Sequence, residues 1–227
     1  MSGMHVTHII DSLRIGGAQR LLLTFAELAA QRQIETCVIS LFSDQDLTIT
    51  KALRKLGVTV VAFPGRRFFS PGRFIRLVGY LRQQKIELRT RMVVHTHLTY
   101  ANALGILAGR VAGLPVIATL HSTGHADHRL HPAAEGLERW ALRTLASRVI
   151  AVGNTVAQAY RSALGQKEIA LIPNAVGDPV VLSPQERREL RLQIAGDPNR
   201  TILISVGRFI PAKAYQDLVT AFAKVHA

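Results

Sequence analysis

The first β–α unit of the chain reads HVTHIIDSLRIGGAQRLLLTFAELAAQ over residues 5–31. Its apolar beginning, residues 5–10, predicts a strand. The apolar positions of residues 18–31 recur at helical spacing, which predicts an amphipathic helix. The loop between these two segments ends on Gly16 and Gly17. The unit is therefore a strand, a glycine-containing loop and a helix.

The same alternation continues through most of the chain. Strands alternating with helices at such short spacing indicate parallel strands covered by helices on both faces. The predicted fold class is therefore α/β, a Rossmann-like parallel sheet. In the helix expected at 71–84 the apolar residues share one face, and Arg73, Arg76 and Arg82 are expected to lie away from it. Further strands are expected at 35–42, 58–63, 92–95, 115–120, 148–152 and 168–172, with helices at 47–56, 71–84, 99–112, 133–146 and 154–164.

A linker is predicted after Pro173, because residues 174–200 are rich in proline, aspartate and arginine. Within it, Ser183 is followed by a proline and, three positions on, by Glu186. A serine followed at this spacing by a glutamate is the capping-box pattern of a helix N-terminus. A short helix is therefore expected at 183–195.

The β–α alternation restarts beyond the linker, with a strand expected at 201–206 and a helix at 215–225. One strand and one helix cannot bury their own apolar faces. We therefore predict a first Rossmann-like domain at 1–173, an interdomain linker at 174–200, and the start of a second, truncated Rossmann-like domain at 201–227.

The charge balance favours anionic partners. The 227 residues include 28 Lys and Arg against 15 Asp and Glu, a net charge of +13. Nucleic acid, acidic lipid and phosphorylated small molecules all fit this surplus. The single cysteine, Cys37, excludes an internal disulfide framework and indicates a reducing compartment. No secretion signal or membrane span is recognisable in the sequence, so a cytoplasmic location is expected.

Five residues near strand ends are candidates for a binding site. Gly16 and Gly17 precede a helix, where free backbone N–H groups attract anions. His121 follows the strand expected at 115–120, and Arg208 and Lys213 follow the strand expected at 201–206. Ligands of open α/β sheets bind outside the carboxyl ends of the strands. Taken singly, the two glycines are more typical of a plain tight turn and the two basic residues of solvated surface charges, and His121 also suits a loop histidine without a role.

Six motifs in one order carry a resemblance to a known family. Together they are similar to the retaining glycosyltransferases of family 4, which have the GT-B fold of two Rossmann-like domains. The resemblance runs from about His5 to the last residue. The motifs are IGGAQR at 15–20, HTH at 95–97, AGLPVIATLH at 112–121, RVIAVGN at 148–154, LIPNAV at 171–176 and SVGRFIPAKA at 205–214.

The resemblance implies a role for each candidate. Gly16 and Gly17 would touch the diphosphate or sugar of a nucleotide-sugar donor, and His121 would face the reacting sugar as a catalytic residue. Arg208 and Lys213 would hold the diphosphate leaving group. The acceptor would be a polysaccharide or a lipid-linked glycan, and no cofactor, catalytic metal or nucleic acid is expected. Family residues that bind the donor ribose and base would lie beyond residue 227, so the chain alone is expected to be inactive.

The chain departs from the family pattern at several positions. Gln19 stands where the family often has glutamate, Gly153 where it usually has serine, and Ala175 where it often has glycine. Ala214 also replaces a frequent glycine. This substitution bears most directly on function, because glycine would ease the entry of a helix close to a phosphate.

The stretch at Arg66, Arg67, Phe68 and Phe69 has two readings. Arginines beside phenylalanines suit contact with an anionic membrane, which would serve a lipid-linked acceptor. Alternatively, the region leads into an ordinary amphipathic helix packed on the sheet. Packing is favoured for the helix, and the Arg-Arg-Phe-Phe tip remains a candidate for peripheral membrane contact.

Three rival classes stay open. A zinc-dependent hydrolase is suggested by His95, His97 and the HSTGH stretch at 121–125, although the carboxylate partners that such sites use are not recognisable. A nucleic-acid-binding module fits the charge, but the basic residues are spread along the chain without a recognition motif. A non-catalytic remnant that keeps the fold as a binding domain is the third.

Overall fold

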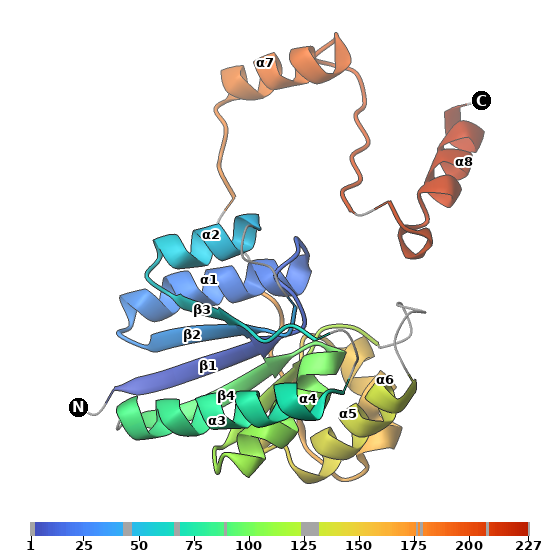
Figure 1. Ribbon diagram of the computed structural model, residues 1–227. Helices are drawn as coiled ribbons and strands as arrows, with labels where there is room; N and C mark the ends of the chain where they lie inside the picture. Colours follow the sequence, from blue (N-terminus) through green and yellow to red (C-terminus); the bar gives the residue numbers. More distant parts are fainter. Residues whose placement is uncertain are drawn as a thin grey trace. The chain divides into compact units, whose positions relative to one another are not determined.

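The computed structural model describes residues 3–42, 47–65, 69–88, 90–123, 132–175, 177, 179–207 and 209–226. Its centre is a seven-stranded sheet with the strand order β3-β2-β1-β4-β5-β6-β7 (Figure 1). Every neighbouring pair is parallel. The predicted α/β fold is thereby confirmed. The strands are β1 (Met4–Ile10), β2 (Glu35–Ser40), β3 (Thr59–Ala62), β4 (Arg91–His97), β5 (Val116–Leu120), β6 (Arg148–Ala151) and β7 (Ile169–Leu171).

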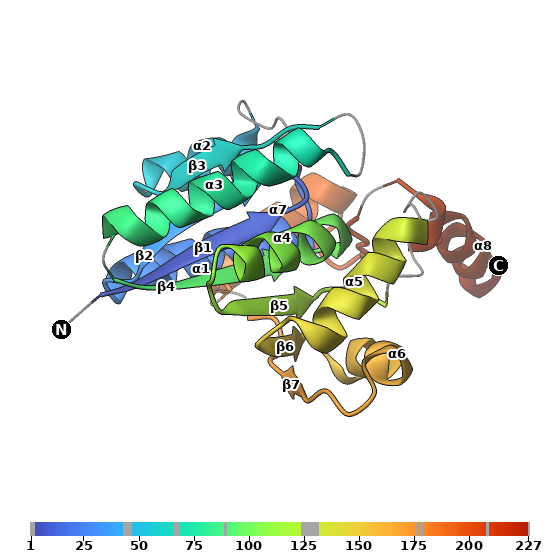
Figure 2. The same ribbon diagram turned by 60° about the horizontal axis from the view of Figure 1, so that its bottom comes forward.

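Helices cover both faces of the sheet. The central strands carry apolar side chains on both faces, and each face needs a covering layer. Figures 1 and 2 show α1 and α2 on one face and α3 and α4 on the other. No described helix has the length and apolar character needed to cross a bilayer. The helices of this layered unit are α1 (Gly17–Gln31), α2 (Thr48–Lys55), α3 (Pro71–Leu88), α4 (Thr99–Val111), α5 (Pro132–Thr144) and α6 (Asn154–Leu164).

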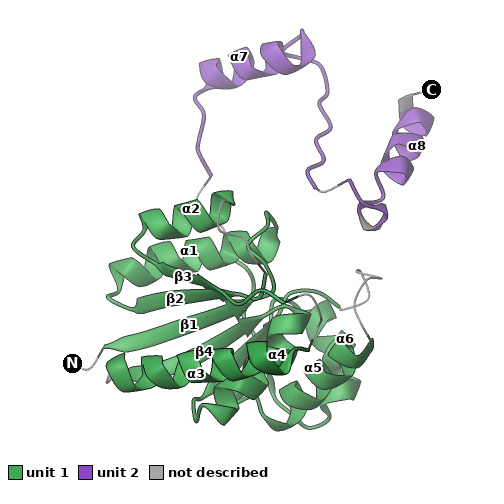
Figure 3. Ribbon diagram, in the orientation of Figure 1, with its two compact units in different colours: residues 1–176 green, residues 177–227 purple. Residues whose placement is uncertain are grey.

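The chain divides into two compact units, residues 1–176 and 177–227 (Figure 3). The first unit holds the whole sheet and helices α1 to α6. The second holds α7 (Pro184–Ala195), the 3-10 turn η1 (Pro211–Lys213) and α8 (Tyr215–His226). Each unit is described by itself below.

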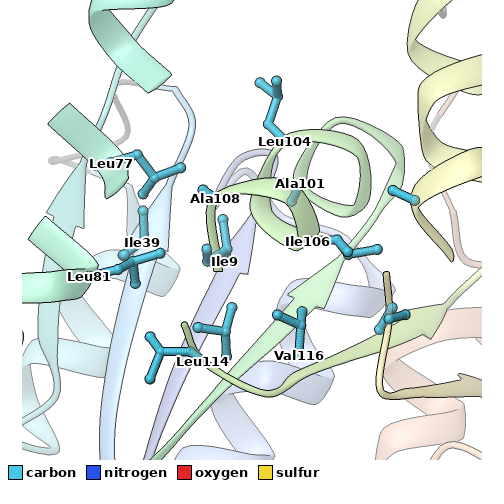
Figure 4. Close-up of a cluster of buried hydrophobic side chains, with 14 of the residues drawn as sticks. Ile9, Ile39, Leu77, Leu81, Ala101, Leu104, Ile106, Ala108, Leu114 and Val116 are labelled. Carbon is cyan, nitrogen blue, oxygen red and sulfur yellow. The ribbon is translucent and has the colours of Figure 1, made fainter. Parts of the chain in front are cut away.

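The core of the first unit consists of two apolar clusters, one on each face of the sheet. Ile9 belongs to the larger cluster, which also contains Leu77 and Leu81 of α3 and Leu104 of α4 (Figure 4). The next residue, Ile10, points into the smaller cluster formed with α1 and α2. This two-residue alternation places β1 at the centre of the unit, buried from both sides.

Two glycines let α4 approach the sheet closely. A Cβ atom on Gly105 would lie 2.8 Å from Cγ2 of Thr96, and one on Gly109 would lie 2.7 Å from Cγ2 of Val116. Real Cβ atoms do not approach so closely, so only glycine fits at this helix–sheet contact. Because α4 begins at Thr99, two residues after β4 ends at His97, its N-terminus lies beside the carboxyl end of that strand.

The structure corrects the expectation for Arg73. This side chain is only 5 % exposed, although it was predicted to lie away from the buried face of its helix. It extends beside Gly65, where an added Cβ would lie 2.7 Å from Nη1 of the arginine. Burial lowers the pKa of the guanidinium. The aliphatic stem of an arginine readily covers apolar surface, which helical periodicity alone does not reveal.

The second unit confirms one local prediction and corrects another. Ser183 caps α7, since its Oγ accepts the N–H of Glu186 at 3.3 Å and its own N–H donates to Oε2 of Glu186 at 2.8 Å. Residues 201–206 form no strand, and Val206 is 91 % exposed. A strand needs a neighbour for its backbone N–H and C=O groups, and among the described residues none pairs with this segment.

Candidate functional site

The candidate site lies at the carboxyl edge of the sheet, where β1, β4 and β5 end side by side. Ile10 of β1 pairs with His97 of β4, which pairs in turn with Thr119 of β5. His121 follows β5 directly. Since neighbouring strands lie about 4.8 Å apart, the ends of β1 and β5 are roughly 10 Å from each other. The strand order reverses here, because β1 leads to β2 on one side and β4 lies on the other, and such switch points bind ligands in open α/β sheets.

Gly16 and Gly17 form the start of α1 at this edge. Gly16 is extended and its carbonyl accepts the N–H of Arg20 at 3.0 Å, which opens the helix. A Cβ on Gly16 would lie 2.5 Å from Oε1 of Gln19, whereas a Cβ on Gly17 would meet no atom within 4 Å. The first turn of α1 contains no acidic residue. Gly17 therefore leaves open space at a helix N-terminus, where an anion is favoured.

Gln19 explains the shape of the glycine loop. Its side chain is 7 % exposed and its Nε2 donates to the carbonyl of Ser12 at 2.9 Å. This hydrogen bond closes the loop from Ser12 to the start of α1. A glutamate, which accepts but does not donate when ionised, could not make it. The departure at position 19 thus has a structural use.

A row of histidines connects the sheet to His121. His8 of β1 pairs with His95 of β4 in the strand register, and His97 lies two residues further along β4 on the same face. Nδ1 of His8 lies 2.9 Å from Nε2 of His97, and Nδ1 of His97 lies 3.0 Å from Nε2 of His121. His95 bonds Oγ1 of Thr119 through Nε2 at 2.7 Å. His121 is therefore anchored through His97 to the centre of the sheet.

These imidazoles are neutral near pH 7. Burial lowers the pKa of His121 to about 4. Burial, together with repulsion from His121, lowers the pKa of His95 to about 4 as well. Burial and repulsion from neighbouring histidines lower the pKa of His8 and His97 well below the usual value. A neutral imidazole donates from one nitrogen and accepts at the other, so each can take part in a hydrogen-bonded row.

The same side chains could hold a transition metal. His8, His95 and His97 each offer one nitrogen atom, and these atoms lie within 4.8 Å of one another. The group is made of imidazoles alone, and His8 and His97 already bond to each other. Metal-bound histidines usually donate their second N–H to a carboxylate, a carbonyl or water. Beyond the cluster, His95 and His97 instead bond to Thr119 and His121, which fits a hydrogen-bonded row better than a metal centre.

Asp11 is a second polar group at this edge. It follows β1, and its Oδ1 accepts the N–H of Ala101 at 2.6 Å while Oδ2 accepts that of Tyr100 at 3.4 Å. Burial raises the pKa of Asp11 to about 7, against the lowering effect of these two N–H donors. The negative charge of Glu138 adds a smaller rise. Sequence reasoning missed Asp11, although a carboxylate directly after a buried strand was a usable signal.

Leu98 adds backbone strain at the same place. It directly follows His97 and caps α4 with φ of 73° and ψ of 164°. A leucine with positive φ is an outlier, and such residues concentrate at functional sites. Nothing in the amino-acid type of Leu98 signals this conformation. The turn from β4 into α4 is therefore held in place by its surroundings.

A buried polar network supports the site from behind. Oε1 of Glu138 on α5 accepts from Nδ2 of Asn102 on α4 at 2.9 Å, and its Oε2 accepts from the hydroxyl of Tyr160 on α6 at 3.4 Å. Thr96 of β4 donates to Oδ1 of Asn102 at 2.8 Å. Glu138 is 3 % exposed, and burial raises its pKa. Hydrogen bonds between these side chains thus join three helices and β4.

The remaining predicted site residues belong to the second unit. Lys213 ends the 3-10 turn η1, and Ala214 follows it with φ of 50° and ψ of 38°. That conformation is strained for alanine and open to glycine, which is the residue the family often has here. Arg208 lies outside the described residues. The roles of Arg208 and Lys213 stay predictions.

Comparison with known proteins identifies relatives of the chain. Residues 15–178 match the model of Glycosyltransferase Family 4. A search of curated protein sequences gave no match. The Anabaena protein Alr3699/HepE in complex with UDP and glucose has a TM-score of 0.78 at 24 % identity, covering 97 % of this chain and 58 % of its own.

Two further solved structures share the fold at lower identity. A glycosyltransferase from Rickettsia africae has a TM-score of 0.74 at 17 % identity, covering 99 % of this chain and 57 % of its own. Sucrose-phosphate synthase from Thermosynechococcus elongatus has a TM-score of 0.71 at 16 % identity, covering 98 % and 60 %. The chain thus spans less than two thirds of each relative's length. Since the family model covers well over half of its residues, the chain belongs to Glycosyltransferase Family 4.

Proposed function

We propose that the protein acts in a retaining glycosyltransferase reaction, in which a hexosyl-type sugar passes from a nucleotide-sugar donor to a polysaccharide or lipid-linked acceptor. One observation carries this proposal: an open helix N-terminus at Gly17 and the anchored His121 occupy the same carboxyl edge of the sheet. Family membership supports it. HepE was solved with UDP and glucose and with UDP-glucose, so UDP-glucose is the first donor to test.

The donor diphosphate would lie against the start of α1. Backbone N–H groups of the first helical turn have no partner within the helix and lie at its positive end. Departure of the nucleotide increases the negative charge on the phosphate, and fixed N–H groups stabilise that charge without rearranging. By the resemblance of their motif, Arg208 and Lys213 would hold the same diphosphate.

His121 would contact the reacting sugar. As a neutral imidazole it can donate one hydrogen bond and accept one, which suits a sugar hydroxyl or a phosphate oxygen. Its attachment to His97 leaves Nδ1 as the nitrogen not engaged by that contact. We propose that this chemistry uses neither a cofactor nor a catalytic metal. Activity that survives EDTA, together with substoichiometric zinc in the purified protein, would support that; zinc at one per chain would favour the hydrolase alternative.

The acceptor is proposed to be presented at a membrane surface on the cytoplasmic side. The motif at residues 66–69 suits an anionic bilayer, and the described member of it, Phe69, is 45 % exposed and lies 6.0 Å from the ring of Phe74. Liposomes containing acidic lipid test this contact. Arg66→Glu combined with Arg67→Glu should weaken binding at low salt, and equal binding of the double variant and the wild type would rule the contact out.

Donor turnover provides the direct test of function. The 227-residue chain, and the complete product if the reading frame continues past Ala227, are incubated with UDP-glucose, and UDP release and donor affinity are measured. We expect the chain alone to be inactive, the complete product to release UDP, and His121→Ala to lower kcat by roughly 100-fold. His5→Gln, a histidine on β1 bonded to Glu35, is the matched control.

The outcomes separate the alternatives. Donor binding without transfer by either product would favour a non-catalytic binding domain. No affinity of the folded complete product for any of a panel of nucleotide sugars would contradict the glycosyltransferase proposal. A steep salt-dependent affinity for nucleic acid would favour the binding-module alternative instead.

A further inference from the structure

Three histidines form one continuous hydrogen-bonded line from the middle of the sheet to its carboxyl edge. The line runs from Nδ1 of His8 to Nε2 of His97 over 2.9 Å, and from Nδ1 of His97 to Nε2 of His121 over 3.0 Å. Both ring nitrogens of His97 are used. The two ends of the line are therefore Nε2 of His8 and Nδ1 of His121.

The ring protons of the three histidines can be placed along this line in only two ways. Burial keeps all three rings neutral, and a neutral imidazole carries a single N–H. Each link needs one donor and one acceptor, so the direction of the first link dictates that of the second. Either every ring donates towards the edge and His121 carries its proton on Nδ1, or every ring donates inward and His8 carries its proton on Nε2.

The surroundings of His8 distinguish the two arrangements. His8 is 1 % exposed, and its Nε2 has no hydrogen-bond partner among the described residues. A buried N–H deprived of an acceptor is among the rarest defects in folded proteins, and a bare acceptor is tolerated more often. The outward arrangement leaves only a lone pair unsatisfied at this nitrogen, so it is the more stable of the two.

We propose that His8 and His97 are positioning residues that hold His121 in the tautomer protonated on Nδ1, so that His121 presents a hydrogen-bond donor at the carboxyl edge. In the reaction proposed above, that donor faces an oxygen of the sugar or the phosphate. The role of the donor rests on the proposed function. The tautomer itself does not, because it follows from the three rings and from the surroundings of His8.

Nitrogen NMR of the histidine rings tests the proposal without any substrate. Long-range ¹H–¹⁵N spectra of the ¹⁵N-histidine-labelled 227-residue chain at pH 7 should show His121 neutral and protonated on Nδ1, the tautomer that free histidine disfavours. His97→Leu should return His121 to a majority of Nε2–H. His5→Gln, on β1 but outside the line, should leave the His121 signals unchanged. Circular dichroism confirms that each variant is folded.

The result on the wild-type chain is decisive even if His97→Leu does not fold. His121 protonated on Nε2 would overturn the proposal, and would mean that His8 donates inward, towards the ring of Phe25 whose centroid lies 4.6 Å away. An unchanged His121 tautomer in folded His97→Leu would also overturn it. If the glycosyltransferase reaction is confirmed, His97→Leu should lower kcat by roughly 100-fold or more at nearly constant donor KM, because His121 loses the partner that orients it. Absence of activity in the complete product would refute the proposed function and leave the tautomer result standing.

Discussion

Asp11 holds the N-terminus of α4 by accepting the backbone N–H of Ala101 at 2.6 Å. The contact joins the end of β1 to a helix ninety positions later in the chain. Asp11 is half-buried, and desolvation of its carboxyl group raises the pKa from 3.8 to about 7. Asp11 is thus both a helix cap and a group that changes charge close to neutral pH.

Asp11→Asn should gain stability relative to the wild type as the pH rises. The folded pKa of Asp11 exceeds its unfolded value, so its contribution to stability is present below about pH 4 and is lost as the pH rises through 7. The unfolding free energy of the variant minus that of the wild type should rise by roughly 2–3 kcal/mol from pH 5 to pH 8. Urea unfolding at both pH values measures it. The histidines titrate alike in both proteins, so their contributions cancel in this comparison. A difference in unfolding free energy that is the same at pH 5 and pH 8 would refute the raised pKa of Asp11.

Gly17→Ala should fold normally and still lose affinity for the donor. An added Cβ meets no atom within 4 Å, so stability should stay within about 0.5 kcal/mol of the wild type. If a diphosphate lies against this backbone, the methyl group should raise the donor Kd roughly tenfold. Calorimetric titration with UDP-glucose measures the affinity. A variant with wild-type affinity would show that the donor does not approach Gly17.

Gly16→Ala is the neighbour with the opposite expectation. Its Cβ would lie 2.5 Å from Oε1 of Gln19 and would displace that side chain from the carbonyl of Ser12. Loss of this part-buried hydrogen bond should lower the free energy of unfolding by about 1 kcal/mol. Gln19→Ala should lower the free energy of unfolding by a similar amount. The loss in the double variant should be smaller than the sum of the losses in the two single variants. Strict additivity would indicate that the two residues act separately.

Two glycines in neighbouring helices should respond oppositely to alanine. Gly105→Ala on α4 pushes a Cβ to 2.8 Å from Thr96 and 3.2 Å from Ile9, which should destabilise the protein by roughly 1–3 kcal/mol. Gly79→Ala on α3 meets nothing within 4 Å and should stabilise it by roughly 0.5–1 kcal/mol through helix propensity. Thermal and urea unfolding compare them. Equal effects of the two changes would contradict the close packing of α4.

The histidines predict a loss of stability in acid. The folded pKa of His95 and of His121 is about 4, below the ordinary value of 6.5, so the unfolded chain takes up protons first as the pH falls. Each contribution is present above pH 6.5 and is lost as the pH falls towards 4, at no more than about 1.4 kcal/mol per pH unit. His121→Gln should reduce this slope. An unchanged slope in the folded variant would show that His121 titrates normally.

Local pattern alone predicted much of the architecture. The helix at 154–164 begins and ends as its periodicity indicates, and the serine–glutamate spacing at Ser183 predicted the cap of α7. Such features depend on residues within a turn or two of one another. The order of motifs likewise pointed to the family, because it is a property of the linear sequence.

The predictions that failed concern contacts between distant residues. The segment 201–206 has the apolar composition of a strand and forms none, because a strand depends on a neighbour that its own residues do not supply. Arg73 is buried because the backbone at Gly65 leaves room for it. Neither outcome is visible in hydrophobic periodicity.

The candidate site divides in the same way. The sequence by itself determined that Gly16, Gly17 and His121 follow strands or precede a helix, and therefore that they gather at one edge of a parallel sheet. Only the tertiary structure decided that His8, 89 positions before His97, lies 2.9 Å from it and continues through it to His121. The physical reason is strand register: the pairing of β1 with β4, and of β4 with β5, is set by packing across the whole sheet, and one step of register would separate the three rings.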